Sequence, residues 1–85
     1  MRQNSNKIST GVTANHRVEY LTSRQEEILR YIRLAITDQG DAPTVAEIAE
    51  QVGLRPSSVH YQLCELETKG AIVRAPGRAR GIRLT

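Results

Sequence analysis

The 85-residue sequence has one cysteine, no tryptophan and no phenylalanine. A single cysteine cannot form a disulfide within the chain, which excludes the small secreted proteins that disulfides hold together. The longest uninterrupted apolar run has three residues, Leu34-Ala35-Ile36, whereas a membrane-spanning helix needs about 20. The polar start, residues 1–7, has no hydrophobic segment of the kind a secretory signal requires. These absences predict one small, soluble, cytoplasmic domain.

The charges are nearly balanced in total but unevenly placed, since 12 basic and 9 acidic side chains leave a net charge of +3. Residues 1–18 carry three basic residues and no acid, whereas residues 19–54 carry three basic against seven acidic residues. Residues 55–85 carry six basic against two acidic residues, a net of +4. An acidic middle beside a basic C-terminal third often marks nucleic-acid binding, although solvated surface charge is the commoner cause of such asymmetry.

Residues 1–18 are rich in Asn, Ser, Thr and Gly and show no apolar periodicity. Such a segment cannot bury enough surface to offset its ordering entropy, so we expect a disordered basic tail. A tail of this charge could contact DNA phosphates, but the inert alternative is the interpretation we prefer. The folded domain is therefore expected to occupy residues 19–85, without internal repeats.

The first predicted helix runs from Ser23 to Gln39. Thr22 and Gln25 match a capping box, in which each side chain accepts a hydrogen bond from the other residue's backbone N–H. Gly40 follows, at the position that tolerates a left-handed conformation. At helical spacing the apolar residues form one stripe: Ile28, Leu29, Ile32, Ala35 and Ile36.

Two shorter helices follow. Thr44 and Glu47 form a second capping box, and Gly53 ends that helix after only about eight residues, so it must pack on its neighbours to be stable. The third helix begins near Pro56, which suits a first helical turn, and Gly70 ends it. The buried residues expected from spacing are Val45, Ile48, Ala49 and Val52 in the second helix and Val59, Leu63 and Leu66 in the third.

The last residues read as a β-hairpin. Two short extended segments, 71–74 and 81–84, flank an arginine-rich turn at 75–80. In the second segment Ile82 and Leu84 alternate with Arg83, as in a half-buried strand. A helical pair joined at a glycine, followed by a third helix and a basic hairpin, predicts a mainly α (α+β) winged helix-turn-helix with a two-stranded antiparallel wing. The alternative for the helical pair alone is an ordinary helical hairpin.

A winged helix-turn-helix lays its third helix in the DNA major groove, with the N-terminal residues at the base edges. The residues that helical geometry turns outward there are the expected base readers: Ser57, Ser58, His60, Tyr61 and, just before the helix, Arg55. The expected contacts to the DNA backbone are Arg78, Arg80, Arg74 and Arg83 of the wing and Thr44 at the start of the second helix. The alternative for the wing is that its arginines only keep a small sheet edge soluble.

Catalytic and metal-binding interpretations find little support. Cys64 and His60 are four residues apart and can face each other, but a metal site needs three or four ligands. The other histidine, His16, falls in the expected tail. A thiolate nucleophile also needs an oriented base and a pocket, which one exposed helix face does not offer. We therefore expect no enzyme activity, no cofactor, no metal and no small-molecule site.

Several ordered motifs carry a family resemblance. They are Leu21-Thr22-x-Arg24-Gln25-x-x-Ile28-Leu29, then Ala42-Pro43-Thr44-Val45-x-Glu47-Ile48, Val52-Gly53-Leu54, Ser57-Ser58-Val59-His60, Leu66-Glu67-x-Lys69-Gly70 and Pro76-Gly77-Arg78-x-Arg80-Gly81-Ile82. Together they resemble the N-terminal DNA-binding domain of LexA repressors over about residues 20–84.

The resemblance implies a module that binds operators of the SOS response, which are palindromes occupied by a dimer. It also assigns the base-reading role to Ser57, Ser58, His60 and Tyr61. The turn at 54–57 is one residue shorter than the family's serine-rich turn, which re-aims the start of the reading helix. The chain stops at Thr85, without the family's self-cleaving peptidase domain and its Ser/Lys dyad, so autocleavage and control by RecA are not expected. The N-terminal tail and initiator Met favour a standalone relative over a fragment.

These observations predict a sequence-specific regulator of transcription, LexA-like and a repressor, that binds double-stranded DNA. We expect it to be associated with the nucleoid and to pair on DNA with a second copy or with a partner protein. The alternative is a winged-helix module that binds proteins and has no specific affinity for DNA, since fold does not fix function.

Overall fold

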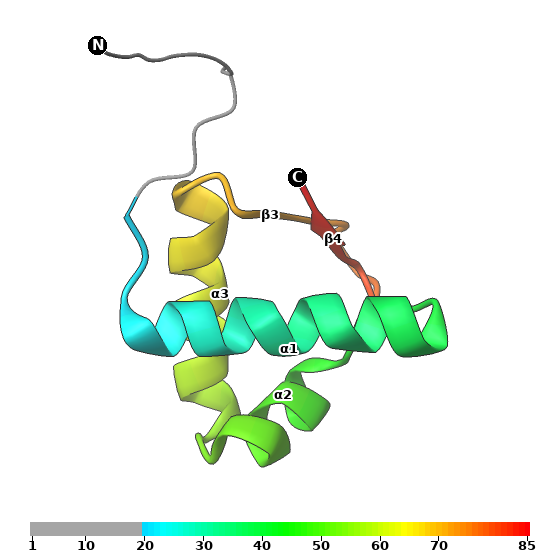
Figure 1. Ribbon diagram of the computed structural model, residues 1–85, viewed down its shortest axis with the longest axis horizontal. Helices are drawn as coiled ribbons and strands as arrows, with labels where there is room; N and C mark the ends of the chain where they lie inside the picture. The colour runs from blue at the N-terminus through cyan, green and yellow to red at the C-terminus, as the bar shows by residue number, and fades with distance from the viewer. Residues whose placement is uncertain (1–19) are drawn as a thin grey trace, which may run out of the picture.

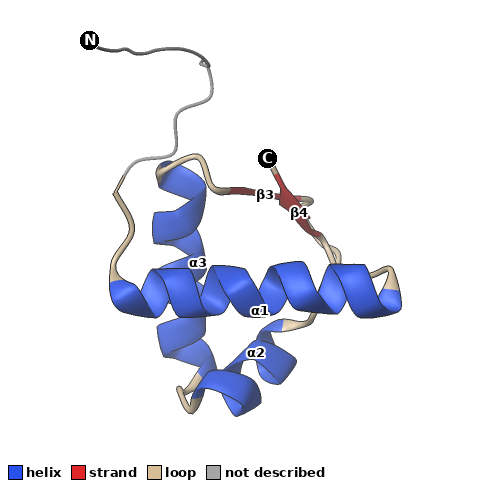
Figure 2. Ribbon diagram, viewed as in Figure 1, coloured by secondary structure: helices blue, strands red, loops and turns tan. Residues whose placement is uncertain are grey.

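The computed structural model describes residues 20–85; the tail expected at residues 1–18 lies outside them. Three helices precede a two-stranded sheet, as Figures 1 and 2 show. Their bounds are α1 (Ser23–Gln39), α2 (Val45–Val52), α3 (Pro56–Thr68), β3 (Ile72–Arg74) and β4 (Ile82–Leu84). The winged helix-turn-helix prediction is confirmed, with each strand one residue shorter than its predicted segment. Within residues 20–85, every helix is too short or too polar to span a lipid bilayer.

Both predicted capping boxes are present and set where α1 and α2 begin. At α1, Thr22 Oγ1 accepts a hydrogen bond from the Gln25 backbone N–H (3.2 Å), and Gln25 Oε1 accepts one from the Thr22 N–H (3.0 Å). At α2, Thr44 and Glu47 make the same reciprocal pair at 3.1 and 2.9 Å. Each pair satisfies two backbone donors that have no partner within the helix.

The turn between α2 and α3 is made by Gly53, which adopts a left-handed conformation with φ +73°. Its N–H and that of Leu54 both donate to the Ala49 carbonyl at 3.0 Å, which closes the end of α2. Pro56 then occupies the first turn of α3, where the missing N–H has no helical acceptor in any case. This short connection holds α3 at a fixed angle to α2.

The core lies where the three helices and the hairpin meet. In the view of Figure 1, α1 runs across α3, with α2 on one side of α1 and the sheet on the other. Among helix and strand residues, the side chains exposed by 1% or less come from every element except β4: Ile28, Ile32, Ile48, Val59, Leu63, Leu66 and Ile72. The apolar stripes predicted for the helices therefore converge on one core, with Val45 and Ile36 at its margin.

The hairpin that forms the wing is antiparallel, with Val73 opposite Arg83. Its loop closes through a hydrogen bond from the Ala75 N–H to the Gly81 carbonyl at 2.9 Å. A Cβ at position 81 would lie 2.7 Å from the Ala75 carbonyl oxygen, so only glycine fits without moving the loop. Ile82 is buried as predicted, but Leu84 is 37% exposed and lines an open recess with Leu21, Arg30 and Thr85.

One polar side chain lies among the core residues. Gln25 is only 4% exposed, and its amide joins α1 to Gln62 of α3 and to Lys69, which directly follows α3. Its Nε2 donates to Gln62 Oε1 (3.1 Å), and its Oε1 accepts from Lys69 Nζ (2.8 Å). Because both ends of the amide have partners, burial leaves neither end unsatisfied.

We expect Ile48→Ala to destabilise the domain by about 2–5 kcal/mol, because it removes a fully buried side chain where α2 meets the core. Leu34→Ala is the control, since Leu34 is 55% exposed on α1 and its truncation should change stability by about 0.5 kcal/mol or less. Urea denaturation followed by circular dichroism measures both. Similar losses of stability in the two variants would contradict the assignment of the core.

Candidate nucleic-acid interface

The N-terminal half of α3 presents polar side chains to solvent. Val59, Leu63 and Leu66 are fully buried, and their shared stripe fixes the rotation of the helix about its axis. The four predicted readers on α3 are all exposed: Ser57, Ser58, His60 and Tyr61. Arg55 precedes the helix as its N-cap, is exposed, and makes no side-chain capping bond. The structure thus brings all five predicted base readers to one end of one helix.

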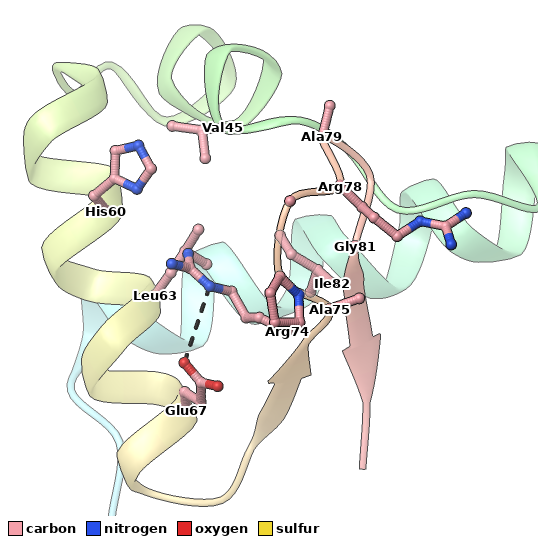
Figure 3. A pocket seen from close by; sticks show the side chains of 12 residues that line it. Val45, His60, Leu63, Glu67, Arg74, Ala75, Arg78, Ala79, Gly81 and Ile82 are labelled. Carbon is pink, nitrogen blue, oxygen red and sulfur yellow. Dashed lines mark ion pairs between the residues drawn. The ribbon is translucent and has the colours of Figure 1, made fainter.

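A groove of about 420 Å³ separates α3 from the wing (Figure 3). We call it the wing groove; its lining includes Val45 of α2, His60, Leu63 and Glu67 of α3, and Arg74, Pro76, Arg78 and Ile82 of the hairpin. Apolar side chains therefore line it together with charged ones and a histidine. The wing groove places one predicted base reader, His60, beside two predicted backbone contacts.

The wing arginines have different surroundings. Arg74 points across the wing groove to Glu67, with 3.9 Å between Nε and Oε1, whereas Arg78 extends from the loop away from α3 (Figure 3). Arg78 makes no ion pair with any residue from 20 to 85. Arg83 is exposed on β4 and lies on the other side of the hairpin, near the end of α1. The structure therefore does not bring Arg83 to the α3 side of the wing.

Arg80 is held by α2 through a forked ion pair that sequence reasoning did not anticipate. Its two terminal nitrogens each donate to one oxygen of Glu47 at 2.9 Å, and Nη1 also donates to the Ala42 carbonyl at 3.0 Å. This geometry ties the tip of the wing to the start of α2. Contact between Arg80 and DNA stays a prediction, but its guanidinium is already engaged within the chain. Thr44, the other predicted backbone contact at this helix start, is half-buried by its capping role.

Glu47 caps α2 and binds Arg80, and both interactions lower the pKa of its carboxyl. The Arg80 guanidinium, followed by the Thr44 N–H, lowers the pKa of the Glu47 carboxyl from 4.5 to about 2. The same pairing raises the pKa of the Arg80 guanidinium above its ordinary value. Both groups are therefore charged throughout the physiological range, and the connection between wing and α2 is a full ion pair.

A second hollow lies on the opposite flank of α3. We call it the Arg24 recess; it has a volume of about 410 Å³ and is lined by Arg24, Leu54, Ser57, Ser58, Tyr61 and Gln62. Arg24 Nη1 donates to the Val52 carbonyl at the end of α2 (2.9 Å) and pairs with Glu27 at 3.1 Å. Sequence reasoning missed Arg24 and Gln62, and the only available signal was the place of Arg24 in a family motif.

The chemistry of this surface is that of hydrogen bonding and positive charge. Hydroxyl, imidazole and guanidinium groups lie along the exposed end of α3 and on both of its flanks. Cys64 is exposed on the same helix, and residues 20–85 contain no group of three or more His, Cys, Asp or Glu side chains placed to hold a metal. Such an array can bind the acceptor-rich base edges and phosphates of a nucleic acid.

Comparison with known proteins agrees with the geometry. The family model described as the LexA DNA binding domain matches residues 18–81. The LexA repressor of Azoarcus sp. (strain BH72) is 48% identical over 71 residues, which cover 82% of this chain and 35% of that protein. The LexA repressor of Pseudomonas aeruginosa (strain LESB58) is 44% identical over 68 residues, 79% of this chain and 33% of that protein. The chain thus spans about a third of the length of these relatives.

We expect Glu47→Gln to lower thermal stability at neutral pH, because the amide loses the charge that holds Arg80. The pKa of Glu47 is lowered in the folded state, so its contribution to stability is complete above about 4.5 and disappears as the pH falls to about 2. Wild type and variant should therefore converge over that window in melts followed by circular dichroism. Glu50→Gln, an exposed change on the same helix, is the control. A constant difference between wild type and Glu47→Gln across the range would contradict this account.

Proposed function

Because this chain belongs to the LexA DNA-binding domain family, we propose that it is a sequence-specific double-stranded DNA-binding regulator of transcription. The relatives it matches are named repressors, and we propose repression here too, at operators in the cytoplasmic nucleoid. The single observation that carries the proposal is the exposed, polar N-terminal half of α3, which lies between the wing groove and the Arg24 recess.

The dimensions of α3 suit the DNA major groove. A helix with its side chains is about 10–12 Å wide, and the major groove of B-DNA is about 12 Å wide. Ser57, His60 and Tyr61 would then meet base edges, where hydroxyl and imidazole groups donate to or accept from purine N7 and guanine O6. The Tyr61 ring, 63% exposed, can pack on a thymine methyl group. Arg55 is the one reader whose fork can pair with guanine.

Affinity comes from the cationic groups around these readers. Arg78 is exposed at the wing and has no ion-pair partner within residues 20–85, so it is the wing residue best placed for phosphate contact. Contacts of this kind set register and strength without reading sequence. A single module buries only about 600–1,000 Å² on DNA, so strong occupancy calls for paired half-sites filled by a second copy or by a partner protein.

We expect the chain to bind duplex DNA with strong salt dependence. With about four to six phosphate contacts, the slope of log affinity against log salt concentration should be about −4 to −5. Arg78→Ala should weaken binding and reduce that slope by about 1, whereas Arg33→Ala, the same change on the exposed face of α1, should leave both unchanged. Fluorescence anisotropy with labelled duplexes measures these quantities. Salt-insensitive binding, or none, would favour the protein-binding alternative.

Sequence preference should depend on α3 rather than on the wing. Selection from random duplexes with the purified chain should enrich a half-site or a spaced palindrome. Tyr61→Ala should reduce discrimination against mismatched sites by about 1–3 kcal/mol for each base contact that the tyrosine makes, while keeping the salt slope. A selection without enrichment, or a Tyr61→Ala variant with unchanged preferences, would contradict base reading by this helix.

A further inference from the structure

The Arg24 recess has a cation fixed at its edge. Arg24 Nη1 donates across 28 residues of sequence to the Val52 carbonyl, so the guanidinium from α1 is anchored where α2 ends and the turn to α3 begins. A guanidinium has five N–H donors, and the interactions with Val52 and Glu27 both use Nη1. Nε and Nη2 have no partner among residues 20–85. The anchoring therefore holds the charge in place while leaving donors for a ligand.

Hydrogen-bond direction sets the orientation of a second group in the recess. Lys69 Nζ and the Thr22 N–H can only donate, so the Gln25 atom that both contact must be its carbonyl oxygen. The Gln25 NH₂ group must then donate to Gln62, which makes the contacted atom of Gln62 its own carbonyl oxygen. This leaves the NH₂ group of Gln62, a pure donor, without a partner among residues 20–85, and Gln62 is one of the residues that line the recess.

We propose that the Arg24 recess seats a phosphate of the DNA backbone, held by Arg24 and by the Gln62 NH₂ group. The inference rests on the proposed function, since it deepens the account of how this chain binds duplex DNA. Ser58 lines the same recess and adds a hydroxyl donor. A phosphodiester carries one negative charge and acceptor oxygens alone, which matches a wall of donors beside a fixed cation.

The position of the recess fits the geometry of a helix in the major groove. The phosphates of the two DNA strands run along the two sides of that groove, so a helix that fills it has a strand on each flank. The wing lies on one flank of α3, with His60 facing it across the wing groove. The Arg24 recess lies on the other flank, beside Ser58 and Tyr61. Its Arg24 guanidinium is therefore placed to pair with the second DNA strand, on the flank of α3 opposite the wing.

Two matched pairs of variants test this phosphate site. Fluorescence anisotropy measures their affinity for the duplex obtained by selection. Gln62→Glu keeps the acceptor for Gln25 but replaces the donor group by a negative oxygen, and Gln51→Glu makes the same change on the exposed face of α2. Arg24→Gln is paired with Arg33→Gln on α1. We expect about tenfold weaker binding for Gln62→Glu and Arg24→Gln, a salt slope lower by about 1 for Arg24→Gln, and little change in either control.

A duplex series with one phosphate at a time replaced by neutral methylphosphonate locates the contact. Wild type should lose affinity at one position per half-site where Arg24→Gln loses none. If Arg24→Gln fails to fold by circular dichroism, Gln62→Glu, which keeps the core hydrogen bond, provides the test.

Three outcomes would overturn the assignment. If the recess variants bound duplex like their controls, the phosphate site would be refuted while the proposed function remained intact. A wild-type chain that binds no duplex would refute both. If inorganic phosphate at constant ionic strength competed strongly with the duplex, the recess would be a site for free anions and not for the DNA backbone.

Discussion

The shape of the surface that we propose for DNA binding depends on one carboxylate. Glu47 caps the backbone at the start of α2 and receives both terminal nitrogens of Arg80 from the wing. The wing is only a two-stranded sheet, and an isolated hairpin of that size is marginally stable in water. Packing of Ile72 and Ile82 secures its base, and the ion pair secures its tip. These two attachments, together with the Arg74–Glu67 pair across the wing groove, set the distance between the wing and α3.

On the other side of α3, residues at the start of α1 likewise make several contacts each. Gln25 completes the capping box of α1. The same side chain accepts a hydrogen bond from Lys69, just after α3, and donates one to Gln62 of α3. Arg24, the preceding residue, joins α1 to the end of α2. The residues that begin α1 and α2 therefore also fix the two flanks of α3. Hydrogen bonds between the elements thus hold this surface in one arrangement, and such preorganisation limits the entropy lost on binding.

Local signals predicted most of the fold. Capping boxes, helix-ending glycines and apolar spacing act over three or four residues, so they can be read directly from sequence, and all three helices were placed correctly. The pairs Glu47–Arg80 and Arg24–Val52 join residues 33 and 28 positions apart, and no local pattern announces them. For this reason Arg80 was predicted only as a DNA contact, and Arg24 and Gln62 were missed. Leu84 was misjudged because alternation in a strand shows which residues share a face, not whether anything covers that face.

The central claim is that the exposed end of α3 and the flanks beside it form the DNA-binding surface. Heteronuclear NMR of the labelled chain, titrated with the selected duplex at low salt, tests it most directly. The account predicts that the largest amide shift changes fall in residues 55–62 and around Arg24 and Arg78, with the exposed face of α1 near Leu34 unaffected. Shift changes centred on that face of α1, with α3 unchanged, would contradict it.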